Sequence, residues 1–494
     1  MSPFLILLVG VLFIVASIIW LRLHPFFALI LAAVLVGVLP SNEVVVDPGF
    51  SWLQQTLGSF ESSATGLGLM AGKIGIVIAL AAVIGQCLME SGAADRITRT
   101  LLNVFGEKRA NWALLLSGYC LSIPVFFDTV FFLLIPLARA MFLRTGKNYM
   151  SYVMAICAGG VITHGIVPPT PGPLLMAETL NIDLGQAILG GFLIGLPVAL
   201  FGGLVLPKLF VARGVDIPMR DAPGSSTAQL QEIVDRPEKE LPGFFASILP
   251  VALPVILITA YSVWKAIDHQ GAILEFMGME NAKLYEVCRD TLALLGNKNL
   301  AMFLATGLAM WLLARSKGYS LKQLTTAIEP ALKEAGVIIL ITAAGGAFGG
   351  MLKGTGIGNT ISDMVTDYVD GGEGTWGLGV LLIFIAWGSA AVMKVAQGSG
   401  TVAVITAAGI MAGVLTGLAE AGVELPYHKI YIFAAISFGA KVISWMNDSG
   451  YWVVCKMSGF TEKETLKTWT AQLAAMGVFG LVEVLILSYL FPLA

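Results

Sequence analysis

The chain has 494 residues, of which 57% are hydrophobic and 12% charged, and its mean hydropathy is +0.84. Soluble domains carry about 25% charged residues, so the composition excludes an ordinary soluble protein and indicates a polytopic membrane protein. The formal net charge of −3 carries little information for such a protein, and the five cysteines show no paired or metal-ligand spacing. We predict no metal site, no cofactor and no nucleic-acid partner.

A helix that spans a bilayer needs about 20 mostly apolar residues. Runs of this kind predict about ten spans, at residues 3–21, 25–40, 71–90, 150–176, 186–207, 244–264, 298–314, 336–352, 429–455 and 473–492. Two further apolar regions, 112–138 and 379–412, are interrupted by polar residues.

The charges that flank these two interrupted regions differ in sign. The first region is flanked by basic residues, namely Arg96, Arg99, Lys108 and Arg109 before it and Arg139, Arg144 and Lys147 after it. The second is flanked by acidic residues, namely Asp363, Asp367, Asp370 and Glu373 before it and Glu420 and Glu424 after it. Basic flanks stay in the cytoplasm, so each region is predicted to enter and leave on one side. They are then re-entrant hairpins of opposite orientation, buried in protein or lining a cavity.

The two halves also match in sequence. Residues 126–130 align with 398–402, and Gly172 aligns with Gly450. The predicted fold class is therefore an all-α polytopic membrane protein with two inverted-topology repeats, each with a re-entrant hairpin and a broken transmembrane helix. The predicted units are a first repeat at 1–207, a cytoplasmic linker at 208–243 and a second repeat at 244–494.

Two spans contain sequences that break helices, at 163–173 and 444–450. Paired broken segments in matching positions indicate the substrate site of a secondary transporter, because free helix N-termini bind carboxylates and free carbonyls bind cations or hydroxyls. Together with the hairpin tips they predict a substrate site made of Phe127, Asp128, Thr129, Thr163, His164, Pro169, Thr170, Gly172, Gly398, Ser399, Gly400, Thr401, Asn447, Asp448 and Ser449.

Three titratable residues at these breaks are candidates for proton coupling. Asp128 and Asp448 would lie at membrane depth, where an ionisable group is by default functional, and His164 titrates near neutral pH. The alternative for each aspartate is a helix N-cap, and the alternative for the histidine is a single structural hydrogen bond.

Lys394 precedes the second hairpin tip, and its ammonium is a candidate partner for a substrate carboxylate or an intramembrane acid. Lys73, Lys353 and Lys441 are interpreted as structural lysines that snorkel to a membrane interface. No hydrolase, metalloprotease or phosphate-loop motif is present, so we predict that the chain is not an enzyme. A channel lined by the re-entrant segments is a further alternative.

Three motifs make the chain recognisable: Thr163-His-Gly-Ile-Val-Pro-Pro-Thr-Pro-Gly-Pro173, the run Gly-Ser-Gly-Thr-Val-Ala-Val-Ile-Thr-Ala-Ala-Gly-Ile at 398–410, and Asn-Asp-Ser-Gly-Tyr-Trp at 447–452. They resemble the gluconate permease (GntP) family over nearly the whole chain. The resemblance implies a bacterial inner-membrane symporter that imports gluconate or related sugar acids with protons, some members taking D-serine. It also implies a homodimer with a scaffold and a mobile transport domain that moves as an elevator.

The chain departs from that family's pattern at the site itself. Asp128 stands where the family has a glutamate, Thr170 where it has a histidine, Lys394 where it has an arginine and Ser449 where it has a proline. Lysine lacks the bidentate fork of arginine, so a different or smaller hydroxy acid is an alternative substrate. Sodium coupling at the same site is the alternative to proton coupling.

Overall fold

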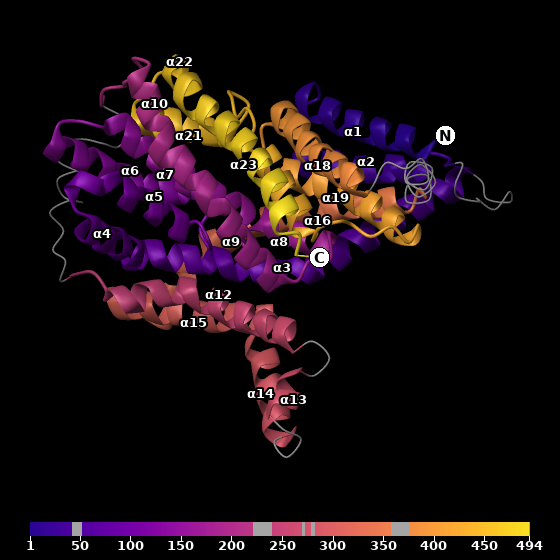
Figure 1. The fold of residues 1–494 in the computed structure, drawn as a ribbon, viewed down its shortest axis with the longest axis horizontal. Helices are drawn as coiled ribbons and strands as arrows, with labels where there is room; N and C mark the ends of the chain where they lie inside the picture. The colour runs from indigo at the N-terminus through magenta and orange to yellow at the C-terminus, as the bar shows by residue number, and fades with distance from the viewer. Residues whose placement is uncertain (42–51, 221–239, 269–271, 278–281, 357–374, 494) are drawn as a thin grey trace.

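The computed structural model describes residues 1–41, 52–220, 240–268, 272–277, 282–356 and 375–493, and these residues form helices and connecting segments without a strand. The first half contains α1 (Pro3–Ile19), α2 (Pro25–Val38), α3 (Trp52–Ser91), α4 (Ala93–Phe105), η1 (Glu107–Arg109), α5 (Ala110–Leu121), α6 (Phe127–Thr145), α7 (Tyr149–Ile166), α8 (Pro171–Thr179), α9 (Leu184–Leu200), the π-helical turn η2 (Phe201–Val205) and α10 (Leu206–Ala212). The second half contains α12 (Phe244–Ile267), α13 (Ala272–Met277), α14 (Ala282–Leu295), α15 (Lys298–Lys317), α16 (Leu321–Lys353), α18 (Thr375–Gln397), α19 (Gly400–Glu420), α20 (Ile430–Gly439), α21 (Ser449–Ser458), α22 (Glu462–Thr465), the π-helical turn η6 (Leu466–Thr470) and α23 (Ala471–Leu490). Figure 1 shows their arrangement.

Nine helices in the described residues are long and apolar enough to cross a membrane. Two of these nine are the hairpin arms α18 and α19, and the shorter apolar helices α1, α2 and α20 complete the set of predicted spans. The protein is therefore an integral membrane protein with the predicted all-α fold.

The predicted repeat is confirmed by the order of the elements. Three helices, a hairpin, a broken helix and a final helix occur as α1, α2, α3, α5–α6, α7–α8 and α9, and again as α12, α15, α16, α18–α19, α20–α21 and α23. The boundaries at 207 and 244 stay a prediction. Residues 221–239 of the predicted linker and the acidic flank at 363–373 lie outside the described residues.

Two helices are longer than their apolar runs predicted. Helix α3 begins at Trp52 instead of residue 71, and α16 begins at Leu321 instead of residue 336. Their extra turns are polar, so a search for apolar runs misses them. A capping box at Ser320 begins α16, and α3 and α16 pack against each other.

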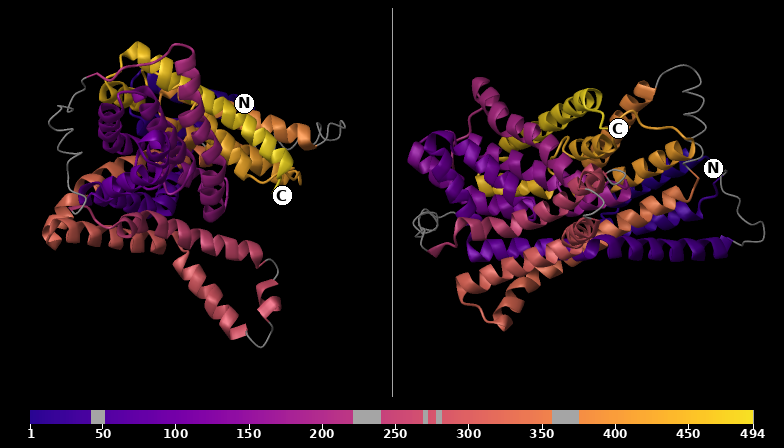
Figure 2. Two further views of the ribbon diagram at one scale, coloured as in Figure 1. Left: turned by 60° about the vertical axis from the view of Figure 1, so that its left-hand side comes forward. Right: turned by 60° about the horizontal axis from the view of Figure 1, so that its bottom comes forward.

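Helices α4, α13, α14 and the short α22 were not predicted, because none of them has a continuous apolar run. Helix α4 follows α3 directly and buries one face only, and α13 and α14 form a pair that projects away from the other helices (Figures 1 and 2).

Contacts between helices divide the chain into two groups. Helices α2, α3, α12, α15 and α16, with α1 against α2, form a framework bundle. The hairpins, the broken helices, α9 and α23 pack on one another as a hairpin bundle. The bundles meet mainly where α16 lies against α19 and α12 against α9.

Ion pairs join the two bundles at the turn between α8 and α9. Lys298 of α15 pairs with Glu178, and Lys265 of α12 pairs with Asp183, which also accepts a hydrogen bond from Ser262. Burial alone would raise the pKa of the Asp183 carboxyl, but these hydrogen bonds outweigh it and hold the pKa below its ordinary value. The turn therefore carries its negative charge against the framework bundle.

A buried arginine fixes the far end of the broken helix α21. Arg139 of α6, 2% exposed, donates hydrogen bonds to the carbonyls of Met457 at 3.1 Å and of Arg220 at 2.9 Å. Tyr149 donates to the carbonyl of Ser458 at 2.8 Å. Because the last carbonyls of a helix have no partner within it, these donors attach α21 to α6 and α7.

We expect Arg139→Met to lower the free energy of unfolding by about 2 to 4 kcal/mol, since two partly buried hydrogen bonds lose their charged donor. Denaturant unfolding of the purified protein in detergent measures this. The matched control is Arg144→Met on the same helix, whose side chain is 62% exposed beside Glu107 and should cost less than about 0.5 kcal/mol. Equal losses in both variants would contradict the anchoring role.

Candidate functional site

Both predicted helix breaks are present. In the first half α7 ends at Ile166 because Pro168 and Pro169 supply no N–H group, and α8 begins at Pro171. The hydroxyl of Thr170 donates a hydrogen bond to the carbonyl of Val167 at 2.7 Å. In the second half the chain leaves α20 at Gly439 and starts α21 at Ser449. Each break leaves helix ends inside the protein.

Both hairpin tips are also present, between α5 and α6 and between α18 and α19. Gly398 turns the second tip with φ of +77°, and a Cβ there would collide with the backbone of Asn447. The Asn447 amide donates to the carbonyl of Val395 at 2.9 Å. The tip and the break of α20–α21 are thus held against each other.

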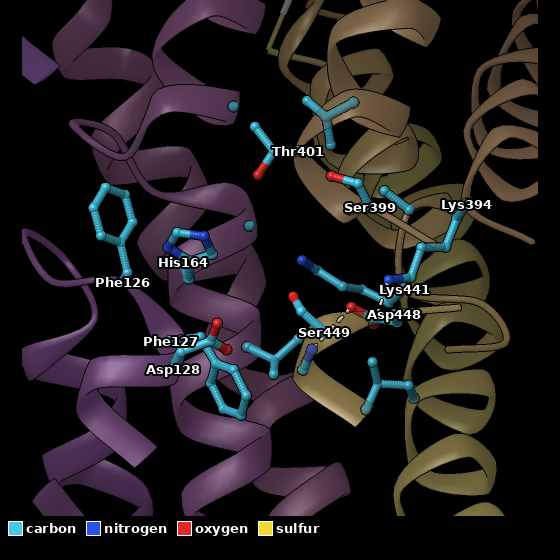
Figure 3. Close-up of a pocket in the computed structure, with 18 of the residues that line it drawn as sticks. Phe126, Phe127, Asp128, His164, Lys394, Ser399, Thr401, Lys441, Asp448 and Ser449 are labelled. Carbon is cyan, nitrogen blue, oxygen red and sulfur yellow. Dashed lines mark hydrogen bonds and ion pairs between the residues drawn. The ribbon is translucent and has the colours of Figure 1, made fainter. Parts of the chain in front are cut away.

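The two tips and the two breaks meet around one cavity of about 260 Å³. Pockets for drug-sized ligands have about 300 to 1,000 Å³, so this cavity suits a small solute. Figure 3 shows its polar side chains pointing inward from both halves of the chain. Among the described residues no group of three or more His, Cys, Asp or Glu is placed to hold a metal ion.

Most of the predicted site residues line this cavity, namely Phe127, Asp128, Thr129, His164, Gly172, Ser399, Gly400, Thr401, Asp448 and Ser449, together with Lys394. The lining does not include Thr163, Pro169, Thr170, Gly398 and Asn447. Thr170, Gly398 and Asn447 instead shape the breaks through the contacts given above. Thr163 is fully buried, and its hydroxyl has no hydrogen-bond partner among the described residues.

Asp448 is at the centre of a closed polar cluster. One carboxylate oxygen accepts hydrogen bonds from Lys394 at 2.6 Å and from Ser444, and the other accepts from the N–H of Gly450 at 3.1 Å. Asp448 is therefore the N-cap of α21, and its charge is balanced by a lysine that is itself buried. Lys394 also donates to the carbonyl of Gly398 at 2.5 Å.

Asp128 has a different environment. The N-cap of α6 is Phe126, and Asp128 lies in the first turn without a capping hydrogen bond. The alternative of an N-cap role for Asp128 is therefore wrong. Its side chain lines the cavity and forms no hydrogen bond or ion pair with the described residues.

Aromatic rings from both halves of the chain also line the site. Phe126 contacts the imidazole edge to face at 5.8 Å, and Phe127 stacks on Trp469 with centroids 5.4 Å apart. The Nδ1 atom of His164 is buried without a hydrogen-bond partner among the described residues. Trp469 belongs to η6, and π-helical turns occur frequently at functional sites.

Sequence reasoning missed several lining residues. Lys441 lines the cavity and is 6% exposed, so the interpretation that it snorkels to an interface is wrong, whereas Lys73 and Lys353 are exposed. The position of Lys441 between α20 and the break could have indicated this. Glu334 of α16 and Trp469 also line the cavity, and both come from segments with no interrupted apolar run.

Comparison with known proteins places the chain among transporters. The model of a family described as GntP family permease matches residues 2–490. The gluconate permease of Pseudomonas aeruginosa is 31% identical over 94% of this chain and 93% of its own length. The high-affinity gluconate transporter and the Gnt-II system L-idonate transporter of Escherichia coli K12 are 27% and 28% identical, each over 98% of this chain and 99% of their own length.

Among solved structures, the YdaH transporter of Alcanivorax borkumensis, described as having an unusual topology, aligns with a TM-score of 0.59. The alignment covers 98% of this chain and 100% of that chain at 16% identity. This similarity supports the fold alone.

We expect Gly398→Ala to destabilise the purified protein, by about 1 to 2 kcal/mol from the left-handed backbone and further from the collision with Asn447. The control is Gly388→Ala within α18, where a Cβ meets no atom within 4 Å and where alanine should stabilise by up to about 1 kcal/mol. Thermal unfolding in detergent distinguishes the two. An unchanged melting temperature for Gly398→Ala would refute the packing of the tip against the break.

Proposed function

This chain belongs to the GntP family of permeases, and from that premise we propose that it imports gluconate or a related sugar acid by proton symport. It is an integral membrane transporter of the bacterial inner membrane and not an enzyme. The observation that carries the proposal is the cavity where both hairpin tips and both broken helices meet. Its relatives are named for gluconate and L-idonate, which are both sugar acids.

The lining of the cavity matches the two kinds of group in a sugar acid. Four helices, α6, α8, α19 and α21, begin beside it, and helix N-termini attract anions. Neutral hydroxyl groups of Thr129, Ser399, Thr401 and Ser449 line the same space and can exchange hydrogen bonds with a polyol. A carboxylate with several hydroxyl groups satisfies both.

A second candidate substrate is a small hydroxy amino acid such as D-serine. It is favoured by the carboxylate of Asp128, which lines the cavity without a partner among the described residues. An ammonium group of the substrate would neutralise this charge.

For a sugar acid, which lacks an ammonium group, a proton on Asp128 would serve the same purpose. Asp448 is less suited to carry the proton because its charge is already balanced by Lys394. His164 is the other candidate, since its Nδ1 atom has no partner among the described residues. We therefore propose Asp128 as the principal proton carrier.

The division into two bundles supports an elevator-type movement. The hairpin bundle supplies nearly all of the lining, while the framework bundle supplies Glu334 and Ile338 of α16. A solute bound in the hairpin bundle could travel with it along α16. Such a movement would separate the ion pairs Lys265–Asp183 and Lys298–Glu178. We also propose a homodimer, in which the framework bundles would form the fixed part.

The function is tested by uptake of radiolabelled gluconate into proteoliposomes, with a pH gradient or a sodium gradient imposed separately. We expect accumulation with the pH gradient alone and inhibition by excess unlabelled L-idonate. Accumulation that requires sodium would overturn proton coupling and support the sodium alternative. Competition by D-serine in place of L-idonate would support the amino acid candidate.

We expect Asp128→Asn to abolish accumulation driven by the pH gradient, because an amide cannot carry the proton, while gluconate counterflow between equal pH values continues. The control is Asp290→Asn on α14, whose side chain is 68% exposed and which lies in the projecting helix pair (Figure 1). Accumulation by Asp128→Asn at the rate of the unchanged protein would rule out this residue as the carrier.

A further inference from the structure

We propose that Lys441, and not Lys394, binds the carboxylate of the transported acid. This inference rests on the proposed function, because it assigns one end of the substrate to one residue of the same cavity. Of the two partners expected for Lys394, a substrate carboxylate or an intramembrane acid, the structure shows the acid, Asp448. The inference therefore assigns the carboxylate to Lys441, which the sequence analysis took as structural.

The two lysines are similarly buried, but only the side chain of Lys394 has hydrogen-bond partners among the described residues. Lys394 is 3% exposed and is bonded to Asp448 and to the carbonyl of Gly398. Lys441 is 6% exposed, and its side chain forms no hydrogen bond or ion pair with the described residues. Of the two cations that the second half supplies to the cavity, only Lys441 remains available to a ligand.

The position of Lys441 directs its ammonium into the cavity. Its stem crosses the surface of α7 at Gly165, where an added Cβ would collide with both Cε and Nζ. Figure 3 shows the Lys441 side chain extending from the break after α20 toward His164, whereas Lys394 extends toward Asp448. A glycine beside His164 therefore opens the route by which this lysine reaches the first half of the site.

No acid of the described cavity already neutralises Lys441. Asp448 is occupied by Lys394, Ser444 and the N–H of Gly450. Asp128 and Glu334 line the same cavity without an ion pair to Lys441. An ammonium that is buried without an anion is costly, so an anion that enters the cavity gains most by binding there.

The same placement orients the rest of the substrate. His164 lies on the side toward which Lys441 points and lines the same cavity, so a hydroxyl close to the carboxylate would lie beside its imidazole, whose ring nitrogens can exchange hydrogen bonds. The hydroxyls of Ser399, Thr401 and Ser449 are then left for the remaining chain of the polyol. A carboxylate with a neighbouring hydroxyl is therefore the chemical class that the site selects.

The test uses the full-length protein purified in detergent and two variants of matched shape, Lys441→Met and Lys394→Met. Binding is measured for gluconate and for sorbitol, the neutral polyol that has a hydroxymethyl group in place of the carboxylate. We expect Lys441→Met to weaken gluconate binding about 10- to 100-fold, as expected for a lost charged hydrogen bond, with sorbitol binding unchanged. Gly165→Ala should weaken gluconate binding in the same way, because it displaces Lys441.

The melting temperature without ligand gives a second readout that does not depend on the identity of the substrate. Removal of an unpaired buried charge should leave Lys441→Met as stable as the unchanged protein or more stable. Lys394→Met should be less stable, because it leaves Asp448 buried without its cation.

The outcomes separate this inference from the proposed function. If the unchanged protein binds gluconate and Lys441→Met retains both its affinity and its preference for gluconate over sorbitol, the assignment of Lys441 is overturned. If the unchanged protein binds no gluconate, the proposed substrate is wrong, and the melting temperatures still decide whether Lys441 is unpaired. A loss of stability in Lys441→Met equal to that in Lys394→Met would show a structural ion pair and overturn the inference.

Discussion

Inside a bilayer every backbone N–H and C=O group needs a partner within the protein, and the four interrupted segments of this chain depend on how that need is met. The second tip and the second break satisfy each other, since Asn447 donates to Val395 and Lys394 donates both to Gly398 of the tip and to Asp448 of the break. Asp448 caps α21 and pairs with the same lysine. Because these groups are hydrogen-bonded to one another, the irregular backbone can lie at membrane depth with these polar groups satisfied.

Some charged side chains of the site are paired with an opposite charge, and others are not paired among the described residues. Lys394 and Asp448 neutralise each other and hold the second half of the site together. Asp128 and Lys441 line the cavity without such partners among the described residues. A buried ion pair stabilises a particular arrangement, whereas a buried single charge lowers its energy only when a ligand or a proton arrives. Within this cluster, the paired residues can therefore be assigned to holding the fold and the unpaired residues to binding the substrate or the proton.

The polar cluster lies where the hairpin bundle meets the framework bundle. The cavity is built mainly by the hairpin bundle and is closed on one side by α16 of the framework bundle. Ion pairs at the turn between α8 and α9 join the bundles near the end of α12 and the start of α15. Because exposed and half-exposed ion pairs contribute little, these contacts can hold one arrangement without preventing its exchange for another.

The sequence by itself determined the fold class, the two hairpins, the two broken helices and the family, because apolar length, flanking charge and the absence of N–H groups in proline are local properties. It also predicted that the four breaks form one site. Only the tertiary structure decided which side chains enter the cavity. Lys394 and Lys441 are both lysines in apolar segments, yet only Lys394 has a counter-ion among the described residues, because packing brings Asp448 from a distant part of the sequence to Lys394 and leaves Lys441 unpaired. Likewise Glu334 enters the cavity, and the polar turns of α3 and α16 are helical, because helices pack against one another. A local pattern of hydrophobicity does not predict such packing.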